Sequence, residues 1–132
     1  MHRYAPELTR IANEFSSRSV DFWLVYPDHS EARSTVARDV SEYNLAGTPL
    51  LDPEHKLVAL AEATVSPEAA VFNRARRLTY LGRIDDRVAA LGKSRPYGTT
   101  HDLEDAVAAT LEGKPVPQPR THAFGCFLAD VK

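Results

Sequence analysis

Cysteine, methionine and tryptophan each occur only once among the 132 residues of this chain. A single cysteine, Cys126, excludes an intramolecular disulfide, which is the usual support of small secreted domains. The sequence therefore carries no mark of an oxidising compartment. It also excludes redox cycles that need two cysteines within one chain.

Long hydrophobic runs are absent as well. The longest apolar stretch, residues 20–26, is interrupted by Asp21 and ends at Pro27, whereas a membrane-spanning helix needs about 20 apolar residues. The first six residues lack the apolar segment of a signal peptide. We therefore expect a soluble cytoplasmic domain without a membrane partner, although a form extended upstream of Met1 could be exported.

An excess of positive charge is also missing. The formal net charge is -2 and the predicted pI is about 6.2, so no basic face is expected for a nucleic-acid partner. Gly-rich phosphate loops, Ser/His/Asp series and His-Glu-x-x-His motifs do not occur, and we expect no cofactor. The hydrophobic content of 43% is sufficient for one folded core.

Alternating helix and strand patterns fill most of the chain. Tyr4, Leu8, Ile11 and Phe15 recur at helical spacing. Residues 20–26 are aromatic and β-branched, which predicts a buried strand with Trp23 and Tyr26 in the core. The other expected elements are a helix capped by Ser30 and carrying Val36, Val40 and Tyr43, a strand at 48–51, a helix from Asp52 to about Ala63, strands at 69–73 and 77–81, a helical turn at 85–91, and a helix capped by Thr99 or Thr100 and ended by Gly113. This order favours an α/β fold whose sheet is first parallel and then closes with an antiparallel hairpin.

A proline-rich stretch divides the chain near its end. Residues 114–119 contain three prolines and predict an extended connector. Beyond it lies a short apolar segment that contains Cys126. We therefore expect a core domain at 1–113, followed by a connector and C-terminal segment at 114–132.

Several motifs follow one another along nearly the whole chain. They are Arg3-Tyr-Ala-Pro-Glu7, Phe22-Trp-Leu-Val-Tyr-Pro27, Thr64-Val-Ser-Pro-Glu-Ala-Ala-Val-Phe72, Tyr80-Leu-Gly-Arg-Ile-Asp-Asp86 and the closing Gly125-Cys126. Together they resemble the thioredoxin-like redoxins of bacterial type, the branch related to the alkyl-hydroperoxide-reductase and thiol-specific-antioxidant proteins. The resemblance implies a thioredoxin-like mixed β-sheet flanked by helices. It also implies thiol-dependent antioxidant chemistry, an oxidoreductase activity on peroxides or disulfides, with a thiol or disulfide protein as partner.

The resemblance further implies two features that this sequence does not contain. Redoxins of this type carry a Cys-Pro pair just before the first helix, which here would lie a few residues upstream of Met1. They also carry a first core strand between the strands expected at 20–26 and 69–73. The family fold would thus be N-terminally truncated here. Either the reading frame is incomplete and its full form is an oxidoreductase, or the chain is a shortened, non-catalytic binding or scaffold module.

A missing central strand would leave unpaired backbone groups in the sheet, which is costly. One hypothesis is that residues 121–128 form a strand that fills this gap, in the same chain or by strand exchange in a homodimer. The alternative is that the segment packs as an edge strand or as coil.

Three residues are candidates for a functional site. The resemblance implies that Pro67 follows a cis peptide bond from Ser66 and lies beside the redox site. Cys126 is either a redox thiol or a small buried hydrophobe. His122 and Cys126 supply two metal ligands at most, fewer than the four of a structural zinc site, so no metal site is predicted. Copper handling by Cys126 with a histidine is the weakest hypothesis, based on some thioredoxin-like proteins.

The charged residues after the second hairpin strand have a structural interpretation. Asp85 and Asp86 are expected to cap the helical turn that follows them, where a helix dipole favours negative charge, more than to act as an acid/base pair. Arg83 and Arg87 are expected to balance that charge at the surface. The hairpin tip itself is expected to expose Arg74, Arg76 and Arg77.

Overall fold

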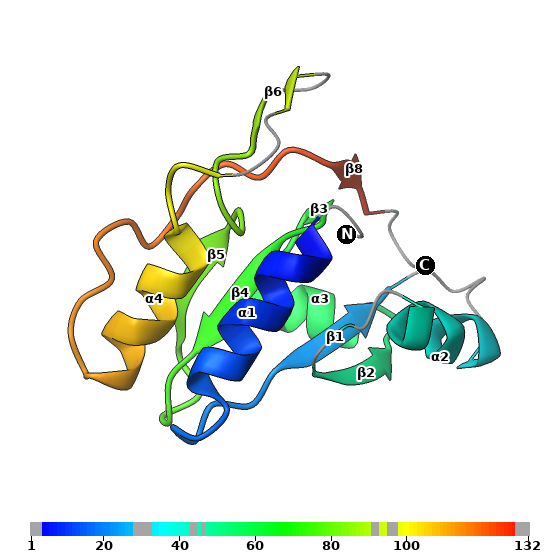
Figure 1. The fold of residues 1–132 in the computed structure, drawn as a ribbon, viewed down its shortest axis with the longest axis horizontal. Coiled ribbons are helices and arrows are strands. Elements are labelled where there is room, and N and C mark those ends of the chain that lie inside the picture. Colours follow the sequence, from blue (N-terminus) through cyan, green and yellow to red (C-terminus); the bar gives the residue numbers. More distant parts are fainter. Residues whose placement is uncertain are drawn as a thin grey trace. The chain divides into compact units, whose positions relative to one another are not determined.

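The computed structural model describes residues 4–27, 33–42, 45, 47–90, 93–94 and 98–128, and the chain divides into two units, residues 1–59 and 60–129. In the first unit the elements are α1 (Ala5–Phe15), β1 (Trp23–Tyr26), α2 (Arg33–Glu42), β2 (Thr48–Leu51) and most of α3 (Lys56–Ala61). In the second unit they are β3 (Val65–Ser66), β4 (Ala69–Phe72), β5 (Leu78–Gly82), β6 (Val88–Ala90), β7 (Lys93–Ser94), α4 (Asp102–Leu111) and β8 (Cys126–Phe127) (Figure 1).

The first helix follows the predicted periodicity. Pro6 lies in its first turn, where the missing backbone N–H has no partner to lose. Ala5, Ile11, Ala12 and Phe15 are buried, which is the face that the sequence spacing indicated. The expected helix is therefore confirmed.

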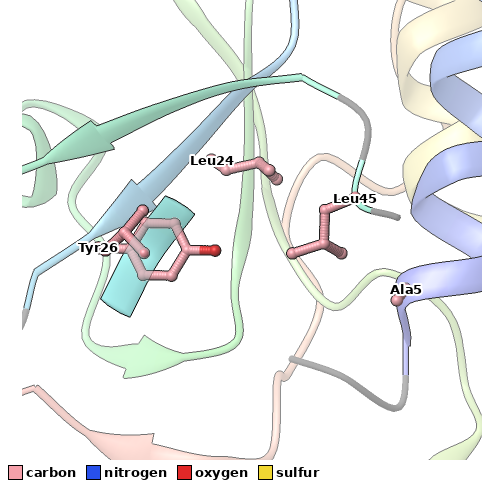
Figure 2. Packing of buried hydrophobic residues seen from close by; sticks show 5 residues of the cluster. Ala5, Leu24, Tyr26 and Leu45 are labelled. Atoms are coloured by element: carbon pink, nitrogen blue, oxygen red, sulfur yellow. The ribbon is translucent and has the colours of Figure 1, made fainter. Parts of the chain in front are cut away.

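In the first unit, β1 and β2 pair in parallel, and Leu24 of β1 lies opposite Pro49 of β2. Leu24 and Tyr26 belong to a buried cluster with Leu45 and Ala5, in which the side chains of Tyr26 and Leu45 point toward one another (Figure 2). Trp23 was predicted to be in the core, and this is wrong because its side chain is 56% exposed. Successive side chains of a strand point to opposite faces, so burial of Leu24 and Tyr26 turns Trp23 outward.

The third helix begins later than the sequence pattern predicted. Asp52 is buried, and its two carboxylate oxygens accept hydrogen bonds from the backbone N–H groups of Lys56 (2.9 Å) and Val58 (3.0 Å). The residues after Asp52 form a turn, and His55 has a φ of 57°. The helix therefore starts at Lys56 and not at Pro53, directly after the predicted N-cap Asp52, and it ends at Ala61, close to the predicted end at about Ala63.

In the second unit, α4 packs on the antiparallel hairpin of β4 and β5. The Thr79 hydroxyl on β5 lies 2.8 Å from the Thr110 hydroxyl on α4. The hairpin is confirmed, with its arginines exposed at the tip. The buried apolar residues of this unit are Tyr80, Leu81, Ile84, Leu103, Ala106, Val107 and Ala123.

Two local predictions in the second unit are wrong. Residues 85–91 were expected to form a helical turn, but β6 at Val88–Ala90 pairs with β7 in antiparallel fashion. The last helix was expected to be capped by Thr99 or Thr100, but α4 begins at Asp102 after His101, without a side-chain cap. In place of the expected caps, Asp86 accepts hydrogen bonds from the Thr99 hydroxyl and from the N–H groups of Thr99 and Thr100, and the Thr100 hydroxyl donates to Asp102.

The α/β class is thus confirmed, but among the described residues the parallel pair β1–β2 and the antiparallel hairpin β4–β5 are separate two-stranded sheets, so the predicted single mixed sheet is not shown. The predicted domain boundary after residue 113 stays a prediction, and the expected Ser30 cap and Tyr43 lie outside the described residues. Over the part of the chain that is described, none of the helices has the length and apolarity required to span a membrane.

Candidate functional site

Two of the sequence-predicted site residues meet where β3 pairs with β8. The Ser66–Pro67 bond at the end of β3 is cis, as expected. β8 lies beside β3 (Figure 1), and the two strands are antiparallel, with Ser66 opposite Cys126 and Val65 opposite Phe127. Residues 60 positions apart in the sequence, Ser66 and Cys126, are therefore backbone neighbours, and Pro67 adjoins them.

The C-terminal segment was proposed to fill a central gap in the sheet of its own chain, and this is wrong. Among the described residues, β8 pairs with β3 alone, whereas β1 pairs with β2 and β4 pairs with β5. Residues just before β8 are already held at the edge of β5, where Arg120 forms a parallel bridge with Leu81. This attachment leads the chain toward β3. Strand exchange between two copies stays a prediction.

A small open hollow of about 190 Å³ adjoins this crossing. The Glu68 carboxylate accepts hydrogen bonds from the backbone N–H groups of Thr64 (2.9 Å) and Val65 (3.4 Å), which tightens the turn around Pro67. On the other wall, the exposed ring of His122 packs edge-on against Phe124, with 4.5 Å between ring centroids. The residues that line the hollow are Thr64, Val65, Glu68, Thr121, His122, Ala123, Phe124 and Gly125.

Gly125 permits the close approach of the two backbones. A Cβ atom at this position would lie 2.2 Å from the carbonyl oxygen of Ser66, far inside van der Waals contact. Only glycine can therefore occupy this position without displacing β8 from β3. The Leu128 N–H then donates to the Thr64 carbonyl at 3.0 Å and extends the pairing by one residue.

Thr121 anchors the segment that leads into the hollow. Its hydroxyl lies 2.6 Å from the Tyr80 hydroxyl and accepts a hydrogen bond from the Arg83 N–H at 2.9 Å. Tyr80 donates its own proton to the Arg83 carbonyl at 2.5 Å, so the Thr121 hydroxyl donates to Tyr80. Burial raises the pKa of Tyr80 to about 12, although the hydrogen bond with Thr121 acts in the opposite direction.

The acidic pair after β5 does not cap a helix, and that prediction is wrong. The Asp85 carboxylate is buried and accepts hydrogen bonds from the backbone N–H (2.9 Å) and the guanidinium (2.9 Å) of Arg87. Arg87 is only 8% exposed, so its expected surface position is also wrong. Asp86 accepts hydrogen bonds from the N–H groups of Thr99 (2.5 Å) and Thr100 (2.9 Å) and from the Thr99 hydroxyl.

Arg83 links this cluster to the helix. Its Nε donates to Asp102 at 2.9 Å, and the Thr100 hydroxyl donates to the same carboxylate oxygen at 2.6 Å. Burial lowers the pKa of Arg83, but the hydrogen bond and the charge of Asp102 outweigh it and raise the pKa above its ordinary value. Sequence reasoning missed this network: several of its bonds join residues 13 to 41 positions apart, although Asp85–Arg87 and Thr100–Asp102 are two apart. The only local signal was the pair of aspartates between two arginines at 83–87.

The site contains one carboxylate and one imidazole, supplied by Glu68 and His122, and the backbone of the only cysteine. In the described part of the chain there is no group of three or more histidine, cysteine, aspartate or glutamate side chains that could hold a metal ion. Copper handling by Cys126 with a histidine is not tested by this finding.

No protein-family model and no curated protein matches the chain. Two solved structures are similar in fold. The hypothetical protein SMc02350 from Sinorhizobium meliloti 1021 has a TM-score of 0.78 and 23% sequence identity, over 97% of this chain and 71% of that chain. An uncharacterized conserved protein from Geobacillus kaustophilus has a TM-score of 0.76 and 24% identity, over 98% of this chain and 69% of that chain. This chain therefore shares a fold with proteins whose names state no activity.

Proposed function

We propose that the chain is a thioredoxin-like redoxin domain whose site is the crossing of β3 and β8 beside Pro67. The observation that carries the proposal is the backbone register that sets Cys126 opposite Ser66. In redoxins of the kind that this sequence resembles, the equivalent proline lies beside the reactive thiol. The order of helices and strands, with a parallel pair followed by an antiparallel hairpin, is compatible with that fold.

The chain as given does not complete a two-cysteine cycle by itself. In thiol–disulfide exchange, a thiolate attacks a disulfide sulfur, a mixed disulfide forms, and a second thiol releases the product. With Cys126 as the only cysteine, the second thiol has to come from another molecule. A thiol or disulfide protein is therefore the partner that this site fits.

A one-cysteine cycle on peroxide is the alternative chemistry. The Cys126 thiolate would attack one peroxide oxygen, which breaks the O–O bond and yields a sulfenic acid and, after protonation, water or an alcohol. Two external thiols would then return the sulfenic acid to the thiol, with release of one disulfide and one water. Cys126 lies in a strand and not at a helix N-terminus, where a thiol pKa is lowered, so we expect this cycle to be slow.

The first experiment measures turnover of the chain as given. Peroxide consumption and reduction of a protein disulfide are followed with dithiothreitol as the external thiol, for this chain and for Cys126→Ser. We expect both proteins to remain at the rate of dithiothreitol alone. Rapid peroxide consumption that is lost in Cys126→Ser would contradict the expectation of a chain without turnover.

The second experiment distinguishes an incomplete reading frame, whose full form is an oxidoreductase, from a shortened, non-catalytic binding module. If the upstream reading frame encodes a Cys-Pro pair a few codons before Met1, the extended protein should turn over, and a serine in place of its cysteine should abolish turnover. A folded extended protein without turnover would contradict the redoxin assignment. A frame without the pair would favour the non-catalytic binding module.

A further inference from the structure

The C-terminal segment is attached to the second unit at two places of very different strength. The first place is residues 119–121. The Leu81 N–H donates to the Pro119 carbonyl at 3.0 Å, and the Thr121 N–H donates to the Leu81 carbonyl at 3.2 Å. The Thr121 hydroxyl adds its two bonds to Tyr80 and Arg83. Four hydrogen bonds to β5 and to Arg83 just after it thus fix this end of the segment.

The second attachment is β8 itself, which has only two residues. It is held by its ladder to β3 and by the bond from the Leu128 N–H to the Thr64 carbonyl. A backbone hydrogen bond contributes about 0.5–1.5 kcal/mol net to stability. A ladder of only two residues is therefore weak. Segments of this kind open locally at a cost well below that of global unfolding.

The chain between the two attachments is suited to act as a hinge. Residues 122–125 form no helix or strand. At Gly125 the backbone lies so close to the Ser66 carbonyl that a side chain would not fit. His122 is exposed and Phe124 is partly buried, whereas Ala123 between them is buried. Figure 1 shows β8 beside β3, at the end of the long connection from α4.

We propose that residues 122–128, hereafter the strap, open and close about Thr121, and that the closed strap occupies the backbone edge of β3 beside Pro67. An extended segment of a partner then has to displace β8 in order to pair with β3. The strap shows what such a segment should look like: it pairs with β3 in antiparallel fashion and has a glycine directly before the residue opposite Ser66. This inference rests on the proposed function, since it states how access to that same site is controlled.

The test uses a fluorescent peptide with the sequence of residues 121–128, made with serine at the cysteine position so that no thiol chemistry contributes. Its binding to the full chain is measured by fluorescence anisotropy. Leu128→Pro removes the N–H that donates to Thr64 and should release the strap, whereas Leu128→Ala keeps that N–H and is the matched control. We expect Leu128→Pro to bind the peptide about tenfold more tightly than the control, the ratio that about 1.4 kcal/mol produces.

Hydrogen exchange supplies an independent readout in the unaltered chain. The Leu128 amide should exchange faster than the Thr121 amide, because opening of the strap breaks the first bond and leaves the second intact. Gly125→Val, whose side chain would collide with the Ser66 carbonyl, provides a second released variant if Leu128→Pro does not fold. A folded released variant that binds no more tightly than Leu128→Ala would overturn the proposal, as would equal exchange at Leu128 and Thr121.

These outcomes are separate from those of the redox experiments. Peptide binding and amide exchange involve neither a peroxide nor a thiol. A chain without turnover can therefore still have an opening strap, and a chain with turnover can lack one.

Discussion

Asp85 and Arg87 form an ion pair that is almost entirely removed from water, with the carboxylate side chain 0% and the arginine side chain 9% exposed. Two bonds to the guanidinium Nε, at 3.1 and 3.2 Å, and one to the backbone N–H satisfy much of the carboxylate. A pair of this kind is costly to break from one side, because the remaining charge stays buried. The sequence analysis assigned Asp85 to capping a helical turn and Arg87 to the surface, where charged side chains usually lie.

Removal of the carboxylate should therefore destabilise the protein strongly. We expect Asp85→Ala to lower the free energy of unfolding by about 3–5 kcal/mol, measured by urea denaturation. Glu54→Ala is the matched control, because it breaks an exposed pair with Lys56 whose nitrogen and oxygen lie 3.7 Å apart. The control should cost less than about 1 kcal/mol. Equal costs for the two variants would show that the Asp85 pair is solvated.

Tyr80 should make stability depend on pH in the alkaline range. Its pKa is about 12 in the folded protein, against an ordinary value of 10.0. Since the folded state holds the proton more tightly, the contribution of Tyr80 is fully present below pH 10.0 and is lost as the pH rises through 12. The difference in tyrosinate absorbance between the chain and Tyr80→Phe should show one group that ionises near pH 12. Ionisation of that group at the ordinary pKa would contradict its burial.

At the scale of elements, sequence patterns that involve only neighbouring residues predicted the helices and strands correctly. The helical spacing of α1 and α4 and the alternation of β4 and β5 were recognised correctly, because each depends on neighbours in the chain. The start of α3 and the strand β6 were not, because each depends on what an aspartate binds. Asp52 caps α3 from four residues away, and Asp85 binds Arg87 in place of a helix terminus.

The contact between β5 and the C-terminal segment leaves no space for a side chain at Gly82. A Cβ atom at Gly82 would lie 2.1 Å from the Thr121 hydroxyl oxygen and 2.7 Å from its carbonyl oxygen. We expect Gly82→Ala to cost about 1–3 kcal/mol and to abolish the hydrogen-exchange protection of the Thr121 amide. Gly113→Ala is the control: its φ is also positive (71°), but a Cβ atom there meets nothing within 4 Å.

That control should lose stability through its backbone alone and leave the Thr121 amide protected. If Gly82→Ala retained this protection, the close approach of β5 and Thr121 would not be needed to anchor the strap. The measurement therefore examines the anchor separately from β8.

At the scale of the whole molecule, the two functional proposals make different demands. Turnover depends on the supply of a second thiol, which the composition already decides, because the chain has one cysteine. Control by the strap depends on where the C-terminal segment is bound, which composition does not decide. The similar solved structures share the fold over 97–98% of this chain, and their names state no activity. The turnover and peptide-binding experiments are therefore the direct tests at this scale.

The sequence by itself determined the α/β class, the helices α1 and α4, the hairpin and the single candidate thiol Cys126, because these depend on local periodicity, turn residues and residue counts; the candidate Pro67 came from the family resemblance. Only the tertiary structure decided that Cys126 lies opposite Ser66, that Thr121 is fixed by Tyr80 and Arg83, and that Asp85 is buried. The partners of Thr121 are 38 and 41 residues away in the chain, and no local pattern encodes contacts over such a separation. Burial likewise depends on which segments fold over a residue, which its immediate neighbours do not specify.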